Sequence, residues 1–315
     1  MARKTSKLIY QPMRVQVRKG SHAEKQYYNS ALPSGPWPMP KAIAPGISPA
    51  PLDDLIFHGG KIVGQMEFQN VFLGSATDWK ESDIASIDAA ITLAMRDKRL
   101  NNVMVQYFHQ QTLSCDPRPL LLLNDPKPAK LGEPDVQAKI VSLLDAGKIK
   151  KSGLDTTIFN LILPPGSVLT LDNSSSLNGL GGYHGSVHVK RAGKTVTLYY
   201  SANVFSQMLS PNKENGIVAF KSNWKNVVAT LYHEINEFRT DADVNDAIQT
   251  GNDDFLGFMS REGEEVGDQP IRVADALNLV FKEVTASAGK KKIPVQLLYS
   301  NAVHGAEGPI SHPHA

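Results

Sequence analysis

A histidine and two glutamates stand close together in the segment HEINEFRTD, with a spacing that suits metal chemistry. His233 and Glu237 are four residues apart, so on an α-helix their side chains would share one face and could share a divalent cation. Glu234 follows His233 directly, and its carboxylate could reach a metal-bound water without being a ligand. This is the layout of the zinc peptidase motif His-Glu-x-x-His with its second histidine replaced by glutamate. The segment predicts His233 and Glu237 as metal ligands and Glu234 as a general base.

A histidine and a glutamate at this spacing also form ordinary hydrogen-bonded surface pairs. The metal interpretation is strengthened by the acidic residues that follow in the chain, which are Asp241, Asp243, Asp246, Glu264, Glu265 and Asp268. Repeated carboxylates near one imidazole suit a hard or borderline cation, although acidic clusters also solvate loops. Zinc is the expected cofactor, with calcium or manganese as alternatives.

Composition narrows the kind of site and the kind of partner. Cys115 is the only cysteine, so an intrachain disulfide and a cysteine-based zinc cluster are excluded, and any metal must be held by histidines and carboxylates. The formal net charge of +2 gives no overall electrostatic footprint for nucleic acid, and a peptide or another small substrate is the expected partner. No run approaches the ~20 apolar residues of a membrane span, and the basic N-terminus lacks the apolar core of a secretion signal. A cytoplasmic location is therefore expected, and the oligomeric state is left open.

The elements that must position these residues can be read from hydrophobic periodicity. Residues 223–246 predict the metal-binding helix, because Val227, Leu231, Ile235 and Phe238 recur at helical spacing. Two further helices are expected over residues 83–98 and 133–146, the second opened by Pro134 and closed by a glycine. Short strands or buried turns are expected for the apolar runs between residues 102 and 123.

Strands are expected over residues 55–57, 61–74, 156–163, 179–189, 195–205 and 292–303. Together with the helices they favour an α/β fold, a mixed sheet packed by helices with the metal helix beneath it, and α+β is the alternative. His184 and His188 are four apart in one extended stretch, so they should face the same side of the sheet. Either could approach the metal helix, although strand histidines more often serve packing or hydrogen bonding.

Three sections differ in composition. Residues 1–52 begin basic and end in a stretch with seven prolines from Pro33 to Pro51, which predicts an arm that is disordered or laid over another surface. Residues 53–303 form the expected single globular domain. Residues 304–315 are expected to be a loose tail with solvated histidines.

Several motifs in order resemble the phosphate-induced protein 1 or exordium-like family and its bacterial zincin-like relatives. They are FHGG at 57–60, GYHG at 182–185, HEINEFRTD at 233–241, GEEVGD at 263–268 and VQLLYSNA at 295–302. The resemblance implies that Glu265 and Asp268 join His233 and Glu237 as ligands. The chain departs from the family pattern in lacking a proline after Thr240-Asp241, and in having Gly181 and Gln269 where many relatives have cysteine.

The expected function is that of a metal-dependent hydrolase, most simply peptidase-like, in which Glu234 takes the proton from a metal-bound water as it attacks a carbonyl. Asp241, Tyr183 and His184 are candidates for supporting positions around the ligands, and Tyr183 or His184 could steady an oxyanion. The alternative is a binding protein without turnover, in which the metal is structural, because additional carboxylate ligands weaken the Lewis acidity of the ion.

Overall fold

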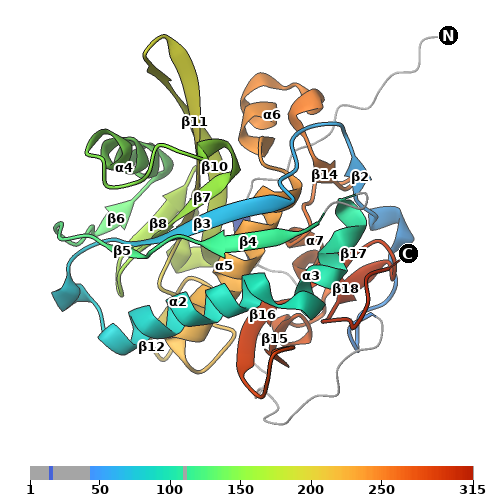
Figure 1. Ribbon diagram of the computed structural model, residues 1–315. Helices are drawn as coiled ribbons and strands as arrows, with labels where there is room; N and C mark the ends of the chain where they lie inside the picture. The colour runs from blue at the N-terminus through green and yellow to red at the C-terminus, as the bar shows by residue number, and fades with distance from the viewer. Residues whose placement is uncertain (1–13, 17–42, 109–111, 315) are drawn as a thin grey trace.

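The computed structural model describes residues 14–16, 43–108 and 112–314, and its central element is a seven-stranded mixed sheet (Figure 1). The strand order is β1-β10-β11-β7-β3-β4, with β5 also beside β3. The pairs among β11, β7, β3, β4 and β5 are parallel, and those of β10 with β11 and β1 are antiparallel. The bounds are β1 Arg14–Gln16, β3 Gln65–Phe72, β4 Ser114–Pro117, β5 Leu121–Leu122, β7 Thr157–Ile162, β10 Leu180–Arg191 and β11 Lys194–Asn203. The expected α/β class, a mixed sheet with packed helices, is confirmed.

Helices cover both faces of this sheet and divide the core in two (Figure 1). Helix α4, Glu133–Asp145, packs on one face, and helices α2, Glu81–Arg96, and α5, Asn223–Thr240, pack on the other. Alternation along the strands fits this arrangement, because Phe159 belongs to the α4 side of the core while its neighbour Ile158 belongs to the α5 side. The helix that carries the predicted metal motif therefore lies against a sheet face.

The segment after α2 is helical, where short strands or buried turns were expected. Helix α3 spans Lys98–Met104 and is followed by a 3-10 turn, Val105–Tyr107. Asp97 explains the difference, since its side chain caps the helix by accepting from the backbone N–H groups of Arg99 and Leu100 at 3.0 and 3.1 Å. A capped helix start outweighed the strand propensity of the valines that follow.

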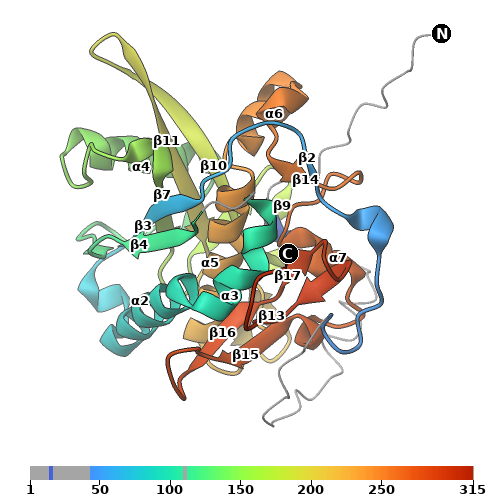
Figure 2. The ribbon, with the colours of Figure 1, turned by 45° about the vertical axis from the view of Figure 1, so that its right-hand side comes forward.

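The C-terminal elements gather beside α5 (Figure 2). They are α6 Val244–Thr250, β14 Phe258–Met259, α7 Asp268–Val273, β15 Phe281–Thr285, β16 Lys292–Gln296, β17 Leu298–Ser300 and β18 Gly305–Glu307. The smaller strands elsewhere are β2 Ile56–Phe57, β6 Lys130–Leu131, β8 Val168–Leu171, β9 Ser174–Ser175, β12 Gln207–Ser210 and β13 Lys213–Asn215. Strand β16, which is not part of the central sheet, also packs along α5.

The predicted loose tail is wrong for residues 305–310, which are packed, whereas residues 311–313, with His312, are exposed. Strand β18 pairs with β17, and Ile310 N donates to Arg99 O at 3.2 Å. His304 Nδ1 and His314 Nε2 lie within hydrogen-bonding distance of the carboxylates of Asp54 and Glu307, at 3.0 and 2.9 Å. Paired histidines and backbone hydrogen bonds hold this segment against the domain.

Most of the predicted arm, residues 1–13 and 17–42, lies outside the described residues. Its described parts are laid on the domain. Strand β1 pairs with β10, and Ala44 N donates to Ala306 O at 2.7 Å. Ala44 and Ile47 are buried. The globular part therefore begins nearer residue 43 than residue 53.

Candidate metal centre

Helix α5 presents two different stripes, and both are buried. Val227, Leu231, Ile235 and Phe238 lie in the apolar core between the helix and the sheet. The polar stripe consists of Thr230, His233, Glu234, Glu237 and Asp241, all without solvent exposure. Their three-and-four spacing places them on one side of the helix. Burying ionisable groups in this way is costly unless they are paired with each other or with a cation.

His233 stands at the centre of the first group of side chains. Its Nε2 atom lies 3.0 Å from Glu237 Oε1 and 3.7 Å from Asp268 Oδ1. Asp268 begins α7, so this group joins the metal helix to the GEEVGD loop. One atom from each of the three residues lies within 4.8 Å of the others, close enough to hold one metal ion.

Gln296, at the end of β16, orients the His233 ring. Its Oε1 atom lies 2.8 Å from His233 Nδ1, and its Nε2 atom donates to Gly267 O. Because the amide nitrogen is committed to a carbonyl, the amide oxygen must accept from the ring, and the ring proton sits on Nδ1. In the neutral ring the Nε2 lone pair then faces Glu237 and Asp268, as a metal ligand requires.

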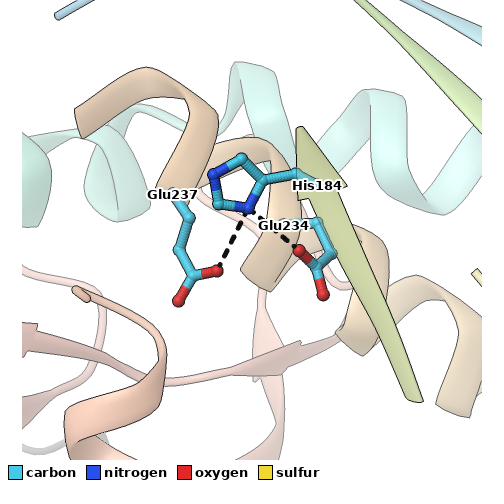
Figure 3. A group of neighbouring side chains, drawn as sticks. All are labelled: His184, Glu234 and Glu237. Carbon is cyan, nitrogen blue, oxygen red and sulfur yellow. Dashed lines mark hydrogen bonds and ion pairs between the residues drawn. The ribbon is translucent and has the colours of Figure 1, made fainter. Parts of the chain in front are cut away.

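His184 organises a second group on the other side of Glu237 (Figure 3). Its Nδ1 atom lies 3.3 Å from Glu234 Oε2 and 3.5 Å from Glu237 Oε2. Its Nε2 atom faces Glu265 Oε1 at 3.6 Å. His184, Glu234 and Glu237 also offer ligand atoms within 4.8 Å of one another. Glu237 therefore belongs to both groups, with Oε1 turned to His233 and Oε2 turned to His184.

A row of polar residues on the sheet leads to His184. Asn70, Asn160, Ser201 and His184 are register partners across β3, β7, β11 and β10. Asn160 Nδ2 donates to Asn70 Oδ1 at 2.9 Å, and Ser201 Oγ donates to Asn160 Oδ1 at 2.8 Å. All four are buried on the face that α5 covers. These hydrogen bonds connect side chains of β3, β7 and β11, and the register of β11 with β10 places His184 next in the row.

Burial and charge together shift the pKa values of the cluster. Burial alone would lower the pKa of His184, but the carboxylates of Glu265, Glu234 and Glu237 outweigh it and hold this pKa well above its usual value. The pKa of His233 is raised in the same way, chiefly by Glu237. Burial would raise the pKa of Glu237, yet the two imidazoles hold it at about 2. Glu237 is therefore the carboxylate most strongly kept in its charged form.

The pKa values of the remaining carboxyl groups are raised, in contrast to that of Glu237. Burial raises the pKa of Glu234 and raises that of Asp241 to about 8. Burial and the charge of Glu237 raise the pKa values of Glu265 and Asp268 well above their usual range. Without a cation the folded protein thus binds protons at these groups more tightly than the unfolded chain does, and their contribution to stability is lost as pH rises.

The donor set fits a divalent cation. Several of its buried atoms accept or donate no hydrogen bond within the described part of the chain: Nε2 of His184 and of His233, Glu234 Oε1, Glu265 Oε1 and both oxygens of Glu237. Zinc bonds of about 2.0–2.2 Å would place the ligand atoms of a tetrahedral site about 3.3–3.6 Å apart. The contacts within the two groups, 3.0 to 3.7 Å, bracket that spacing. Buried histidine, glutamate and aspartate groups able to hold a metal ion are thus present.

Three of the four predicted ligands, His233, Glu237 and Asp268, come together in one group, and the fourth, Glu265, contacts His184 instead. Asp241 ends α5 beside the cluster, where its Oδ1 atom accepts from Gly257 N at 2.8 Å. The expectation that the helix continues to residue 246 is wrong. Helix α5 ends at Thr240 and α6 begins at Val244, because Asp241 turns its side chain to the backbone of another loop.

The supporting role expected of Tyr183 is wrong. Its side chain lies in the core on the α4 face of the sheet, where its ring packs edge to face with Tyr200. Successive residues of a strand point to opposite faces, so Tyr183 and His184 cannot both face α5. His188 does share the face of His184, but it pairs with Asp246 of α6 at 2.7 Å.

Two further acidic residues named from the sequence, Asp243 and Glu264, belong to neither group. Each has a partner outside the two groups of potential ligands: Asp243 accepts from Tyr199 OH at 2.6 Å, and Glu264 lies 3.8 Å from Arg272.

Two residues of the site were missed from the sequence. Gln296 stands out as a polar residue in the apolar run from Ile293 to Leu298. Gly267 lies against the His233 ring so closely that a Cβ atom there would collide with it. Both residues lie in motifs that carry the family resemblance, Gly267 in GEEVGD and Gln296 in VQLLYSNA, but neither was given a role.

No helix of the described chain has the length and apolar character needed to cross a membrane. Searches of family models, curated proteins and solved structures gave no match to this chain. The chemistry of the site must therefore be argued from its own geometry.

Proposed function

We propose that this protein is a metal-dependent hydrolase, most simply one that acts on peptides. His233, Glu237 and Asp268 would hold the ion, and Glu234 would be the general base. The observation that carries the proposal is the position of Glu234. Its carboxylate is buried beside the first group without belonging to it, and its Oε1 atom has no hydrogen-bond partner within the described residues. The resemblance to the exordium-like family implies these three ligands together with Glu265. Zinc is the first choice of ion, with calcium or manganese as alternatives.

Each residue around the proposed metal ion would have a separate role in hydrolysis. A bound cation supplies Lewis acidity and lowers the pKa of a coordinated water toward ~7. Gln296 keeps the proton of His233 on Nδ1, so that Nε2 is free for the ion. His184 holds one oxygen of Glu234 at 3.3 Å, which leaves the other to accept the proton of the attacking water. Burial raises the pKa of Glu234, which moves its basicity toward neutral pH, where a general base works best.

A structural metal site without turnover is the second candidate function, and burial of the cluster favours it. His233, Glu234 and Glu237 have no exposed surface, and among the ligands of the first group only the side chain of Asp268, 11% exposed, reaches solvent. A coordination sphere closed by protein ligands would have no position for a substrate.

A peptide-library digest would test the hydrolase directly. Wild type, Glu234→Gln, Glu237→Gln and chelated wild type are compared after elemental analysis of each. We expect Glu234→Gln to keep a metal ion and lose ~10²–10⁴-fold in rate, while Glu237→Gln loses the ion as well. Cleavage that survives Glu234→Gln would exclude Glu234 as the base. A metal-loaded wild type that cleaves nothing would favour the structural site.

A further inference from the structure

Glu237 is shared by two groups of potential ligands, and its two oxygens face different ways. Oε1 lies 3.0 Å from His233 Nε2, and Oε2 lies 3.5 Å from His184 Nδ1. The first group is completed by Asp268 and the second by Glu234. Figure 3 shows the second group, with the His184 ring between the two glutamates. Apart from Glu237, the two groups have no residue in common, so occupation of one does not use up the ligands of the other.

We propose that His184, Glu234 and Glu237 form a second divalent-cation site, bridged to the first by the Glu237 carboxylate. This deepens the proposed function and rests on it for the role of the first ion. Histidine nitrogen with two carboxylates is a donor set that suits zinc or manganese. A carboxylate that bridges two ions about 3.5–4 Å apart is a common arrangement in hydrolytic two-metal sites.

The second group is built as a site and is more than a cluster of acids. Its three side chains come from two elements, β10 and α5, and each is at most 1% exposed. Glu234 Oε1 and Glu237 Oε2 are buried without a hydrogen-bond partner among the described residues. The contacts of His184 with Glu234 and Glu237, 3.3 and 3.5 Å, are those expected between ligands of one ion.

Charge favours two ions over one. Metal binding displaces protons, and then Glu234, Glu237, Glu265 and Asp268 carry four negative charges, while their partners in the described chain, His184 and His233, are neutral ligands. One divalent cation would balance two of the four negative charges, and a second would balance the rest.

The second ion would have a chemical consequence for the first. Glu234 would become a ligand of the second ion. The carboxylate proposed as general base would then no longer be free to accept a proton. High metal concentration is therefore expected to inhibit hydrolysis through the second site.

The test is metal stoichiometry, which needs no substrate. Apo protein is dialysed to equilibrium against increasing Zn²⁺, and in parallel against Mn²⁺, and bound metal is counted by elemental analysis. Wild type should bind two ions in two steps. His184→Gln and Glu234→Gln should each bind one, and Glu237→Gln should lose affinity at both steps. His188→Gln is the matched control, since it removes a histidine from the same face of the same strand, and it should still bind two.

Circular dichroism of each variant checks folding, and the Glu234→Gln variant keeps the test decisive should His184→Gln misfold. A wild type that saturates with one ion would overturn the second site, as would a folded Glu234→Gln variant that binds two. Failure of the proposed function looks different, because wild type would then bind two ions and cleave no peptide at any metal concentration, including one ion per chain. If wild type binds one ion and hydrolyses peptide, and the Glu234→Gln variant does not, the second site is refuted and the proposed function stands.

Discussion

Replacing Gln296 by methionine should weaken metal binding although Gln296 touches no ion. Methionine has nearly the same length as glutamine but carries no amide. The substitution therefore removes the acceptor of His233 Nδ1–H and the donor to Gly267 O. In the metal-free variant the His233 proton can move to Nε2 and bond Glu237 Oε1, 3.0 Å away. Binding an ion must then break that bond and return the proton to an Nδ1 without a partner.

The size of the effect follows from these two steps. A hydrogen bond to a charged group contributes about 1.5–3 kcal/mol, and an unsatisfied buried N–H costs about 1–3 kcal/mol. Part of this is recovered by relaxation, and mutation of groups that orient metal-binding histidines typically costs ~10–100-fold in affinity. We expect a loss in that range, equivalent to about 1.4–2.7 kcal/mol.

Competition with a chromophoric chelator measures the affinity, and thermal unfolding of the chelated proteins measures stability separately. Gln69→Met is the matched control, since Gln69 is a buried glutamine with one hydrogen bond, to Pro119 O at 2.8 Å, on a strand remote from the cluster. It should lower stability and leave affinity unchanged. Gln296→Glu keeps an acceptor for Nδ1–H and should restore most of the affinity. If Gln296→Met binds metal within twofold of wild type, the assigned tautomer is wrong.

Three further predictions concern the same architecture. The melting temperature of the chelated protein should fall as pH rises from about 5 to 8, because burial raises the pKa of Asp241 to about 8. Asp241→Asn should reduce this dependence of melting temperature on pH. Added metal should stabilise the protein more at higher pH, because metal binding displaces protons. A slope of opposite sign in the chelated protein would contradict the pKa assignment. Tyr183→Phe should leave metal affinity unchanged in the same chelator assay, because Tyr183 lies on the α4 face of the sheet; any clear loss would place it at the site. A chain that starts at residue 53 should be less stable than one that starts at residue 43 by about 2–4 kcal/mol in denaturant unfolding, because Ala44 and Ile47 are buried; equal stability would show that this packing contributes nothing.

Local sequence was enough to predict the elements that carry the site. The apolar spacing of Val227 to Phe238 requires a helix with one face in a core, and a helix necessarily puts His233 beside Glu237. Their ion-pair distance of 3.0 Å is a consequence of that geometry. Proline and glycine near its ends likewise predicted α4, which spans Glu133–Asp145. Periodicity is a local property, and these inferences needed no knowledge of the partner elements.

What only the tertiary structure decided is which distant residues meet the helix. The register of β10 against β11 sets which residues of GYHG face α5, and it turned His184 toward Glu234 and Tyr183 into the opposite core. The packing of β16 brought Gln296 to the far side of His233. Sequence spacing fixes which residues share a face of one element, but the choice of face and of facing element depends on the burial of the whole sheet. The contact of Glu237 with His184, in addition to His233, therefore depends on the tertiary structure.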